Sequence, residues 1–403
     1  MRTSDIYHTQ GIQDFHVKST SYAGGIVRVS LVPDSTRRPM CPICGSYDVA
    51  RREIGHRDVI GLKMGTKQVV FEVPVFRLDC AGCSANQREC LPFVEKWARH
   101  TKAVSRTVIE LRRDMSISAV ANWTGLDWRT VKEIEKRHLT AKFKRIRLRD
   151  VRIIGVDEIH VGDKLYKTIV RDLESGAVLF VGEGKGGDAL APFERRLRKV
   201  KHKIKAIAMD MSTGYSAWAA RFLPDAKIVF DHFHLIKLMN EKLNIIRRRT
   251  VGSLDEDTRK QLKHKRRLFL RNEEDLEIDE LKELEKLKET FGDLGTGHGL
   301  KEKLRSIYRH AANEYDARPL LEDWAKLAEA SGIGPLQAMA RTVSNHLDGI
   351  LGYWRFDELT SAGMEGFNNK IRWLIHQAYG FHDQEYFDLK IYDLPNCSTS
   401  KDI

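Results

Sequence analysis

The spacing of hydrophobic positions divides the chain into three stretches of different character. Residues 1–97 contain segments rich in β-branched residues, at 26–32 and 68–77, which are typical of strands. From residue 98 the apolar positions follow helical spacing, and after residue 151 short apolar runs alternate with helical stretches. The pattern predicts a β-rich part, a small helical part and a mixed α/β part, in that order.

The stretch after residue 151 has an informative order of elements. Three strands come first, joined as a meander, and a helix, a strand, a helix and a last strand follow. This is the order of a ribonuclease-H-like domain, a mixed α/β sheet with helices on both faces. The predicted segments are strands at 152–158, 165–172, 177–182, 204–209 and 226–230, and helices at 187–200 and 215–222.

A long helical stretch separates these strands from the C-terminal part of the chain. Residues 250–355 are rich in charge and carry a stripe at helical spacing, formed by Leu281, Leu284 and Leu287. We predict an all-helical insertion here, with a break at the glycine run 292–299.

Composition narrows the class of protein. A chain of 403 residues with 42% hydrophobic content is expected to fold into two or three domains. It has no apolar run long enough to span a membrane and no apolar signal core, so we expect a cytoplasmic protein. The formal net charge of +12 and the pI of about 9.3 indicate a polyanionic partner, and nucleic acid is the usual one.

Four of the six cysteines form two CxxC pairs, Cys41 with Cys44 and Cys80 with Cys83. Each pair makes a tight turn in which two thiolates can face one cation, so two pairs can complete a tetrahedral zinc site. The strand at 68–77 lies between the pairs, which predicts a zinc ribbon. Four thiolates leave no vacant coordination position, so we expect a structural Zn²⁺ without catalysis. The alternative is four unrelated buried thiols.

Residues 116–137 have the pattern of a helix-turn-helix. Ser116 is placed to cap a helix with an apolar face of Ala119, Val120 and Trp123, and Gly125 is placed to end it. Asp127 is placed to cap the next helix. Between 99 and 150 there are 14 Lys/Arg and 6 Asp/Glu, a net charge of +8, which favours DNA binding over a plain helical hairpin. The side chains that we expect near DNA are Trp128, Arg129, Lys132, Lys136 and Arg137.

Two aspartates stand in the mixed α/β stretch where phosphodiester chemistry would need them. Asp157 lies on the first predicted strand and Asp210 ends the fourth. Adjacent parallel strands would bring both side chains together. Transfer of a phosphodiester needs two divalent ions, and Mg²⁺ prefers carboxylate oxygens and water as ligands. We therefore predict a catalytic metal site here, which requires a third acid.

Glu365 is the candidate for that acid. Glycines precede and follow it, and the predicted helix places Glu365, Asn369 and Arg372 on one face. A carboxylate, an amide and a guanidinium suit a metal ion and phosphate. Phe367 and Ile371 belong to an apolar stripe that can pack against the sheet.

Rival residues stand beside each predicted aspartate. Strand alternation sends Glu158 and Asp157 to opposite faces, so only one can join the centre. Asp231 is more naturally a cap for the following helix, in which His234 makes a local or DNA contact. Arg247 and Arg248 near the end of that helix form a plausible phosphate-binding cluster, and a solvated basic end is the alternative.

These segments resemble the bacterial insertion-sequence transposases of the ISL-three family over nearly the whole chain. The matching segments are Cys41-Pro42-x-Cys44-Gly45 with Cys80-x-x-Cys83, Gly155-Val156-Asp157-Glu158, Met209-Asp210-Met211, Asp231-His232-Phe233-His234, and Glu365-Gly366-Phe367-Asn368-Asn369-Lys370-Ile371. The resemblance implies a DDE triad of Asp157, Asp210 and Glu365 on a ribonuclease-H-like fold, with Mg²⁺ or Mn²⁺ as cofactor. It also implies binding to the terminal inverted repeats of the element and cut-and-paste transfer into target DNA.

The complete prediction is a multidomain α+β protein that acts on double-stranded DNA as a homodimer or higher oligomer, close to the bacterial nucleoid. Its predicted parts are a β-rich lead-in and zinc ribbon at 1–97, a helix-turn-helix domain at 98–150, the first part of the catalytic core at 151–249, the helical insertion at 250–355, and a catalytic helix and tail at 356–403. Two other functions use the same features. One is a regulator that binds DNA through the zinc and helix-turn-helix parts alone, and the other is a nuclease without strand transfer.

Overall fold

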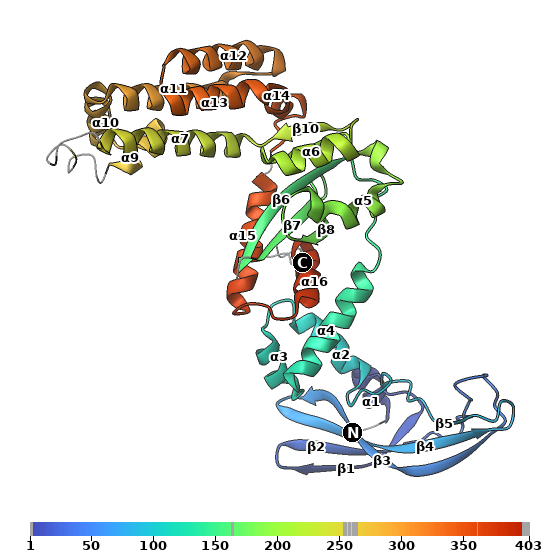
Figure 1. Cartoon of the computed structure of the whole chain (residues 1–403). Coiled ribbons are helices and arrows are strands. Elements are labelled where there is room, and N and C mark those ends of the chain that lie inside the picture. The colour runs from blue at the N-terminus through green and yellow to red at the C-terminus, as the bar shows by residue number, and fades with distance from the viewer. Residues whose placement is uncertain are drawn as a thin grey trace. The chain divides into compact units, whose positions relative to one another are not determined.

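The computed structural model describes residues 3–162, 165–252, 256, 259, 265–360 and 362–396, which belong to two compact units, Met1–Lys144 and Arg145–Ile403 (Figure 1). Each unit has cores of its own and is described by itself. No helix of the described residues is both long and apolar enough to cross a membrane.

A five-stranded sheet forms the first part of the N-terminal unit, and its strand order is β1-β2-β4-β3, with β5 paired to β4. The alternating strands β2 and β4 turn Val29 and Phe71 into a common core, as the pattern at 26–32 and 68–77 predicts. Gly61 of β3 lies against the Phe71 ring, where a Cβ would come within 2.3 Å of it. The elements are α1 (Thr3–Gln10), β1 (Phe15–Ala23), β2 (Ile26–Pro33), β3 (Val49–Met64), β4 (Lys67–Cys80) and β5 (Asn86–Arg88).

Three helices complete this unit: α2 (Lys102–Leu111), α3 (Ile117–Thr124) and α4 (Trp128–Phe143). The predicted turn is confirmed. Ser116 caps α3 by accepting a bond from the Ala119 N–H, Gly125 takes the left-handed conformation at φ 74°, and Asp127 caps α4 by accepting from the Arg129 N–H.

The prediction that Trp123 faces the helical core is wrong. Its side chain is 41% exposed, and the Lys63 ammonium lies 5.8 Å from its ring centre. The core face of α3 is formed by Val120, Ala121 and Thr124, which follow i, i+1, i+4 spacing and leave residue 123 on the outer side.

A second five-stranded sheet organises the C-terminal unit, with the strand order β10-β9-β6-β7-β8. Strands β6, β7 and β8 form an antiparallel meander, and β9 and β10 run parallel to β6. The predicted order of strands and helices is therefore observed. The elements are β6 (Ile153–Gly162), β7 (Leu165–Asp172), β8 (Val178–Glu183), η1 (Gly187–Leu190), α5 (Ala191–Leu197), η2 (Lys201–Lys203), β9 (Ala206–Met209), α6 (Thr213–Phe222) and β10 (Lys227–Phe230).

Helices cover both faces of this sheet, since alternate residues of β6 enter different cores. Ile154 and Val156 pack with residues of α5 and α6, whereas Ile159 packs with residues of α15 (Ala362–Gln377) and α16 (Gln384–Asp393). A short η4 (Leu394–Asn396) follows, and Cys397 lies outside the described residues. Two helices that end the chain thus cover a sheet that begins more than 200 residues earlier.

Helices make up most of the described residues between β10 and α15, in agreement with the helical stretch predicted at 250–355. They are α7 (His232–Gly252), α9 (Arg266–Leu270), η3 (Glu273–Asp275), α10 (Ile278–Thr290), α11 (Gly292–His310), α12 (Glu314–Ala330), α13 (Gly334–Asn345) and α14 (Leu347–Arg355).

The predicted break is observed at Phe291, because α10 ends at Thr290 and α11 begins at Gly292. The glycine run 292–299 does not itself interrupt the helix, because α11 contains the whole run. A Cβ at Gly297 would lie 2.9 Å from the Leu243 side chain, and one at Gly295 would lie 2.7 Å from the Lys288 carbonyl. These glycines therefore allow α11 to pack closely on its neighbours, which outweighs their low helix propensity.

Candidate active site

Three aspartates occupy one level across the parallel part of the second sheet. The register pairs Gly155 of β6 with Ala208 of β9, so two residues further along, Asp157 aligns with Asp210. Because β9 pairs with β10 in the same way, Asp231 continues the row. The side chains of neighbouring strand ends therefore form a carboxylate centre, the name used below for Asp157, Asp210 and the side chains around them.

Asp157 is the most constrained member of the carboxylate centre. One of its oxygens accepts a bond from the Glu158 N–H at 2.8 Å, and the other accepts a bond from the Asn368 amide Nδ2 at 2.6 Å. Burial raises the pKa of Asp157 to about 6, with a further small increase from Asp210, and His234 opposes this rise. Asp157 is half-buried, and desolvation disfavours its charged form, so a nearby cation would stabilise that form.

Glu158 points to the opposite face, as strand alternation predicts. It pairs in register with Thr168, whose hydroxyl lies 3.0 Å from the Tyr215 hydroxyl. Burial raises the pKa of Tyr215 to about 12, and the charges of Glu158 and Asp210 add to the effect. Glu158 therefore lies on the α6 side of the sheet, away from the Asp157 carboxylate.

Asp210 and Asp231 differ in exposure. Asp210 is partly exposed, and its carboxylate accepts the Ser212 N–H at 3.1 Å. Asp231 is 2% exposed and accepts the Phe233 N–H at 3.0 Å. Asp231 therefore bonds to the first turn of α7, as predicted, and Asp210 is the more accessible of the two.

His234 lies close enough to Asp157 to affect its pKa. Its Nδ1 atom is buried and has no hydrogen-bond partner among the described residues. The structure thus places the predicted DNA contact His234 at the carboxylate centre.

Glu365 lies in the first turn of α15, on its exposed side. Asn369 and Arg372 are also exposed, and the Arg372 guanidinium donates to the Asn369 side-chain oxygen at 2.6 Å. Among the described residues, Asp157, Asp210 and Glu365 do not form a group whose ligand atoms all lie within 4.8 Å of one another. The predicted face of α15 is present, and the structure leaves it open to solvent.

Arg171 of β7 holds the beginning of α15. Its guanidinium donates to the Gly363 carbonyl at 2.5 Å, lies 4.2 Å from the Phe367 ring centre, and also donates to the Gly176 carbonyl. Gly155 allows the same approach, because a Cβ there would lie 2.9 Å from the Met364 sulfur. These contacts fix the helix that carries Glu365 on the Asp157 face of the sheet.

Sequence reasoning assigned no role to Asn368, Arg171 or Gly155. For Asn368 a signal was available, because it follows Met364 by four residues and precedes Ile371 by three, on the face that packs against the sheet. No local pattern identifies Arg171, whose partner Gly363 is 192 positions away.

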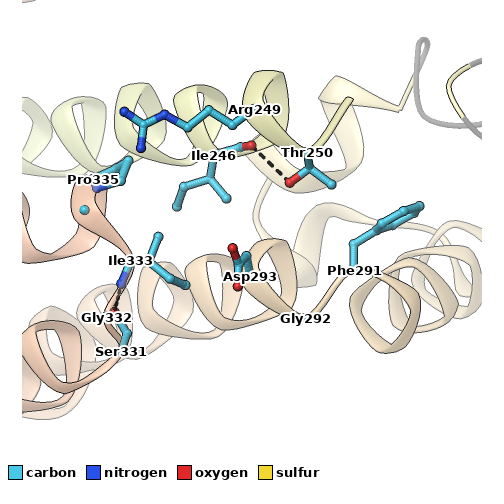
Figure 2. A pocket seen from close by; sticks show the side chains of 11 residues that line it. Ile246, Arg249, Thr250, Phe291, Gly292, Asp293, Ser331, Gly332, Ile333 and Pro335 are labelled. Carbon is cyan, nitrogen blue, oxygen red and sulfur yellow. Dashed lines mark hydrogen bonds between the residues drawn. The ribbon is translucent and has the colours of Figure 1, made fainter. Parts of the chain in front are cut away.

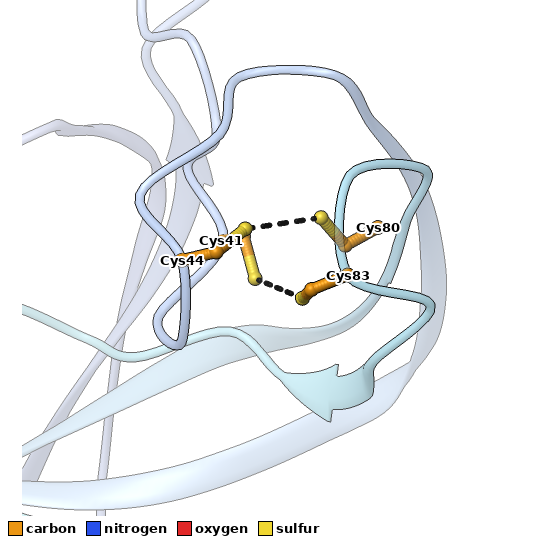
Figure 3. A group of neighbouring side chains, drawn as sticks. All are labelled: Cys41, Cys44, Cys80 and Cys83. Atoms are coloured by element: carbon orange, nitrogen blue, oxygen red, sulfur yellow. Dashed lines mark hydrogen bonds between the residues drawn. The ribbon is translucent and has the colours of Figure 1, made fainter.

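The four predicted cysteines form a group with all ligand atoms within 4.8 Å of one another, called the cysteine cluster below (Figure 3). The Cys41 and Cys83 sulfurs are 3.7 Å apart, and those of Cys44 and Cys80 are 3.6 Å apart. Backbone N–H groups of Cys44 and Ile43 lower the pKa of Cys41 to about 6, which favours the thiolate that a metal ion binds. Cys90 is exposed and lies outside the group.

The candidate DNA-binding side chains follow α4. Trp128 is 49% exposed with the Arg129 guanidinium 5.0 Å from its ring centre, and Lys132 and Lys136 are half-buried. Arg137 is exposed but makes an ion pair with Glu95 at 2.8 Å. The opposite face of α4 is buried, where Glu135 pairs with Arg112 at 2.6 Å. The exposed face of α4 is thus available to a nucleic acid.

Arg247 and Arg248 lie near the far end of α7, about 20 Å along the helix from His234 at 1.5 Å per residue. Arg247 donates to the Asn244 side-chain oxygen at 3.2 Å, and burial lowers the pKa of Arg247. The structure therefore does not bring these arginines to the carboxylate centre.

An open pocket of about 650 Å³ lies beside this end of α7, at the beginnings of α11 and α13 (Figure 2). Arg249 and Asp293 are among its lining residues. None of the predicted acids lines it, so the pocket is separate from the carboxylate centre.

Comparison with known proteins finds two family models. One, described as a transposase, matches residues 154–391, and the other, described as the helix-turn-helix domain of transposase family ISL3, matches residues 89–139. The transposase for insertion sequence element IS1001 of Bordetella parapertussis is 32% identical over 358 residues, 87% of each chain. The transposase for insertion sequence element IS1557 of Mycobacterium tuberculosis is 26% identical over 93% of this chain and 90% of its own.

Among solved structures, a chain of the Drosophila P element transposase strand transfer complex is similar with a TM-score of 0.41 and 13% identity. The similarity covers 74% of this chain and 92% of that one.

Proposed function

Because this chain belongs to the ISL3 family of transposases, we propose that it cuts DNA at the ends of an insertion sequence and joins those ends to target DNA through Asp157, Asp210 and Glu365. The observation that supports this most directly is the register of β6 and β9, which aligns Asp157 with Asp210 on adjacent parallel strands. We also assign the sheet to the ribonuclease-H-like class, on the basis of its strand order β10-β9-β6-β7-β8.

The donor set at the carboxylate centre fits Mg²⁺ or Mn²⁺. Both ions prefer oxygen ligands, and the centre offers the carboxylates of Asp157 and Asp210. The raised pKa of Asp157 is the behaviour of a carboxylate that gains from a neighbouring cation. When bound, the ions would supply charge stabilisation to the attacking and leaving oxygens of the phosphodiester.

The residues of this chain contribute position and access. The Glu158 N–H and the Asn368 amide hold Asp157 still, and Arg171 holds the helix of Glu365. The proposal requires Glu365 to join the two aspartates when DNA and metal are bound. Asn369 and Arg372 share its exposed face and are suited to contact the DNA backbone.

For the N-terminal unit we propose DNA-end recognition. The cysteine cluster would hold one structural Zn²⁺, and α4 would contact the terminal inverted repeats through Trp128, Arg129, Lys132 and Lys136. Arg137 would have to exchange Glu95 for a phosphate. Two element ends must be joined to one target DNA, which favours a dimer or higher oligomer on double-stranded DNA. The proposed location is the bacterial cytoplasm, at the nucleoid.

The test uses Asp157→Asn, Asp210→Asn and Glu365→Gln in the full chain, with labelled element ends and a target plasmid. Each variant is expected to lose cleavage and joining by about a thousandfold or more, because the charge that holds the metal ions is removed. Binding to the ends, measured by gel shift, is expected to stay unchanged.

Asp225→Asn, at an exposed loop position next to β10, is the matched control. Full joining by any of the three variants would overturn the assignment of that acid. Cleavage without joined products in the unmodified chain would instead indicate a nuclease.

A further inference from the structure

We infer that Asn368 is a positioning residue of the carboxylate centre, which fixes the orientation of Asp157 only when α15 is docked on β6. The inference rests on the proposed function of Asp157. Asn368 is the neighbour of Asn369, which the sequence predicted to be a DNA contact. The two amides lie on different faces of the helix, because Asn368 is buried and Asn369 is exposed.

The Asp157 carboxylate is held by two donors from different elements. The Asn368 Nδ2 donates to one oxygen at 2.6 Å, and the Glu158 N–H donates to the other at 2.8 Å. A carboxylate only accepts hydrogen bonds, so the amide must present its nitrogen. The terminal torsion angle of an aspartate side chain has a broad distribution of allowed values. Two donors from different elements therefore restrict the Asp157 carboxylate to one orientation.

The Asn368 amide is buried in an apolar contact between α15 and the sheet. Asn368 is 4% exposed, and its Oδ1 atom is buried with no hydrogen-bond partner among the described residues. A buried polar atom without a partner destabilises a fold. Packing alone would be served better by an apolar side chain here, since Met364, Phe367 and Ile371 on the same face are buried. The amide is therefore explained by the bond that it makes to Asp157.

The Asn368–Asp157 hydrogen bond connects distant parts of the chain. Asp157 and Asn368 are 211 positions apart, and Asn368 follows Glu365 by one helical turn. The bond can form only when α15 lies on the sheet, where Arg171 also holds it. Docking of one helix thus orients the first acid and brings the third acid to the same face of the sheet.

The test measures metal binding directly, besides activity. Mn²⁺ is titrated into the full-length, DNA-free protein, and free Mn²⁺ is followed by electron paramagnetic resonance. Asn368→Leu keeps a similar size and removes the donor, so it is expected to weaken Mn²⁺ binding about tenfold or more, the usual effect of losing a partner of a metal ligand. The Mn²⁺ concentration for half-maximal joining should rise by the same factor, and the melting temperature should stay near that of the unmodified protein.

Gln377→Ala is the matched control, because it removes an exposed amide from the same helix. Asn368→Ala, which also lacks a donor and leaves space instead of bulk, replaces the leucine variant if that variant melts at a lower temperature. Unchanged Mn²⁺ binding in a folded Asn368 variant would overturn the inference. Normal joining of DNA by Asp157→Asn would overturn the proposed role of Asp157 itself. The Mn²⁺ titration of the Asn368 variants tests only the role of Asn368, so the two outcomes can be distinguished.

Discussion

The cysteine cluster and the carboxylate centre are assembled in opposite ways. Each half of the cysteine cluster is a short loop, and the β3–β4 hairpin brings the two loops together, with all four ligand atoms within 4.8 Å. The carboxylate centre takes one acid from β6 and one from the end of β9, and the helix of the third comes from beyond a long helical insertion.

A site whose ligands come from one hairpin and a site whose ligands come from distant segments differ in how completely they are assembled. The cysteine cluster is closely gathered because its geometry depends on one hairpin. Glu365 remains exposed, although Asn368 on the same helix already contacts Asp157. We therefore expect metal removal to affect the fold at the first site and metal addition to affect activity at the second.

The largest effect should come from breaking the cysteine cluster. Cys80→Ser removes a buried ligand, and structural zinc contributes on the order of 10 kcal/mol to the folding of such sites. The expected result is loss of bound zinc, measured by elemental analysis, with a lower melting temperature and weaker binding to element ends. Cys90→Ser, an exposed cysteine outside the group, is the control. Full zinc content in Cys80→Ser would show that the cluster is not the zinc site.

A smaller effect is expected from the charge of Asp157. The pKa of Asp157 is raised from 3.8 to about 6, so the folded chain binds this proton more tightly than the unfolded chain. The protonated Asp157 stabilises the folded chain fully below about pH 4, and this stabilisation is lost as the pH rises through 6. The loss in the free energy of unfolding is up to about 3 kcal/mol, at 1.36 kcal/mol per pKa unit.

Chemical unfolding at pH 4 and pH 8, in buffer without Mg²⁺ or Mn²⁺, measures this loss. Asp157→Asn should remove that part of the pH dependence and be the more stable protein at pH 8. Asp225→Asn serves as the exposed control. An identical pH dependence in Asp157→Asn and the unmodified chain would argue against a raised pKa of Asp157.

The smallest effect is expected from Gly155→Ala. The added Cβ would lie 2.7 Å from a Leu173 methyl group and 2.9 Å from the Met364 sulfur, both of which are ends of flexible side chains. A destabilisation of about 1 kcal/mol is expected, at the low end for overpacking. Denaturant unfolding measures it, and a Met364→Ala background should reduce it. An equal cost in both backgrounds would mean that Gly155 does not set the approach of α15.

Sequence predicted those parts of the molecule that depend on neighbouring residues. Ser116, Gly125 and Asp127 end and begin helices through contacts within three positions, and all three act as expected. The same holds for the two CxxC turns, which need only one hairpin to meet. The order of strands and helices along the second unit was predicted from short apolar runs that alternate with helical stretches.

The remaining features depend on distant partners. The spacing of Trp123 is compatible with a position in the core, but the buried face of α3 is formed by Val120, Ala121 and Thr124. The glycines at 295 and 297 weaken a helix in isolation, and only contact with Lys288 and Leu243 explains them.

The placement of α15 after the insertion has a consequence for synthesis on the ribosome. Residues up to the end of β10 can pair into a sheet early, whereas the apolar face around Ile159 and Ile169 stays uncovered until α15 has emerged. At roughly 5–20 residues per second, synthesis of the residues between β10 and α15 takes about 7–26 seconds, during which this face has no cover from α15. Only a chain that already includes α15 can cover this face of the sheet and join Asn368 to Asp157. A product that lacks α15 would therefore have no Asn368–Asp157 hydrogen bond and would expose the apolar sheet face around Ile159 and Ile169.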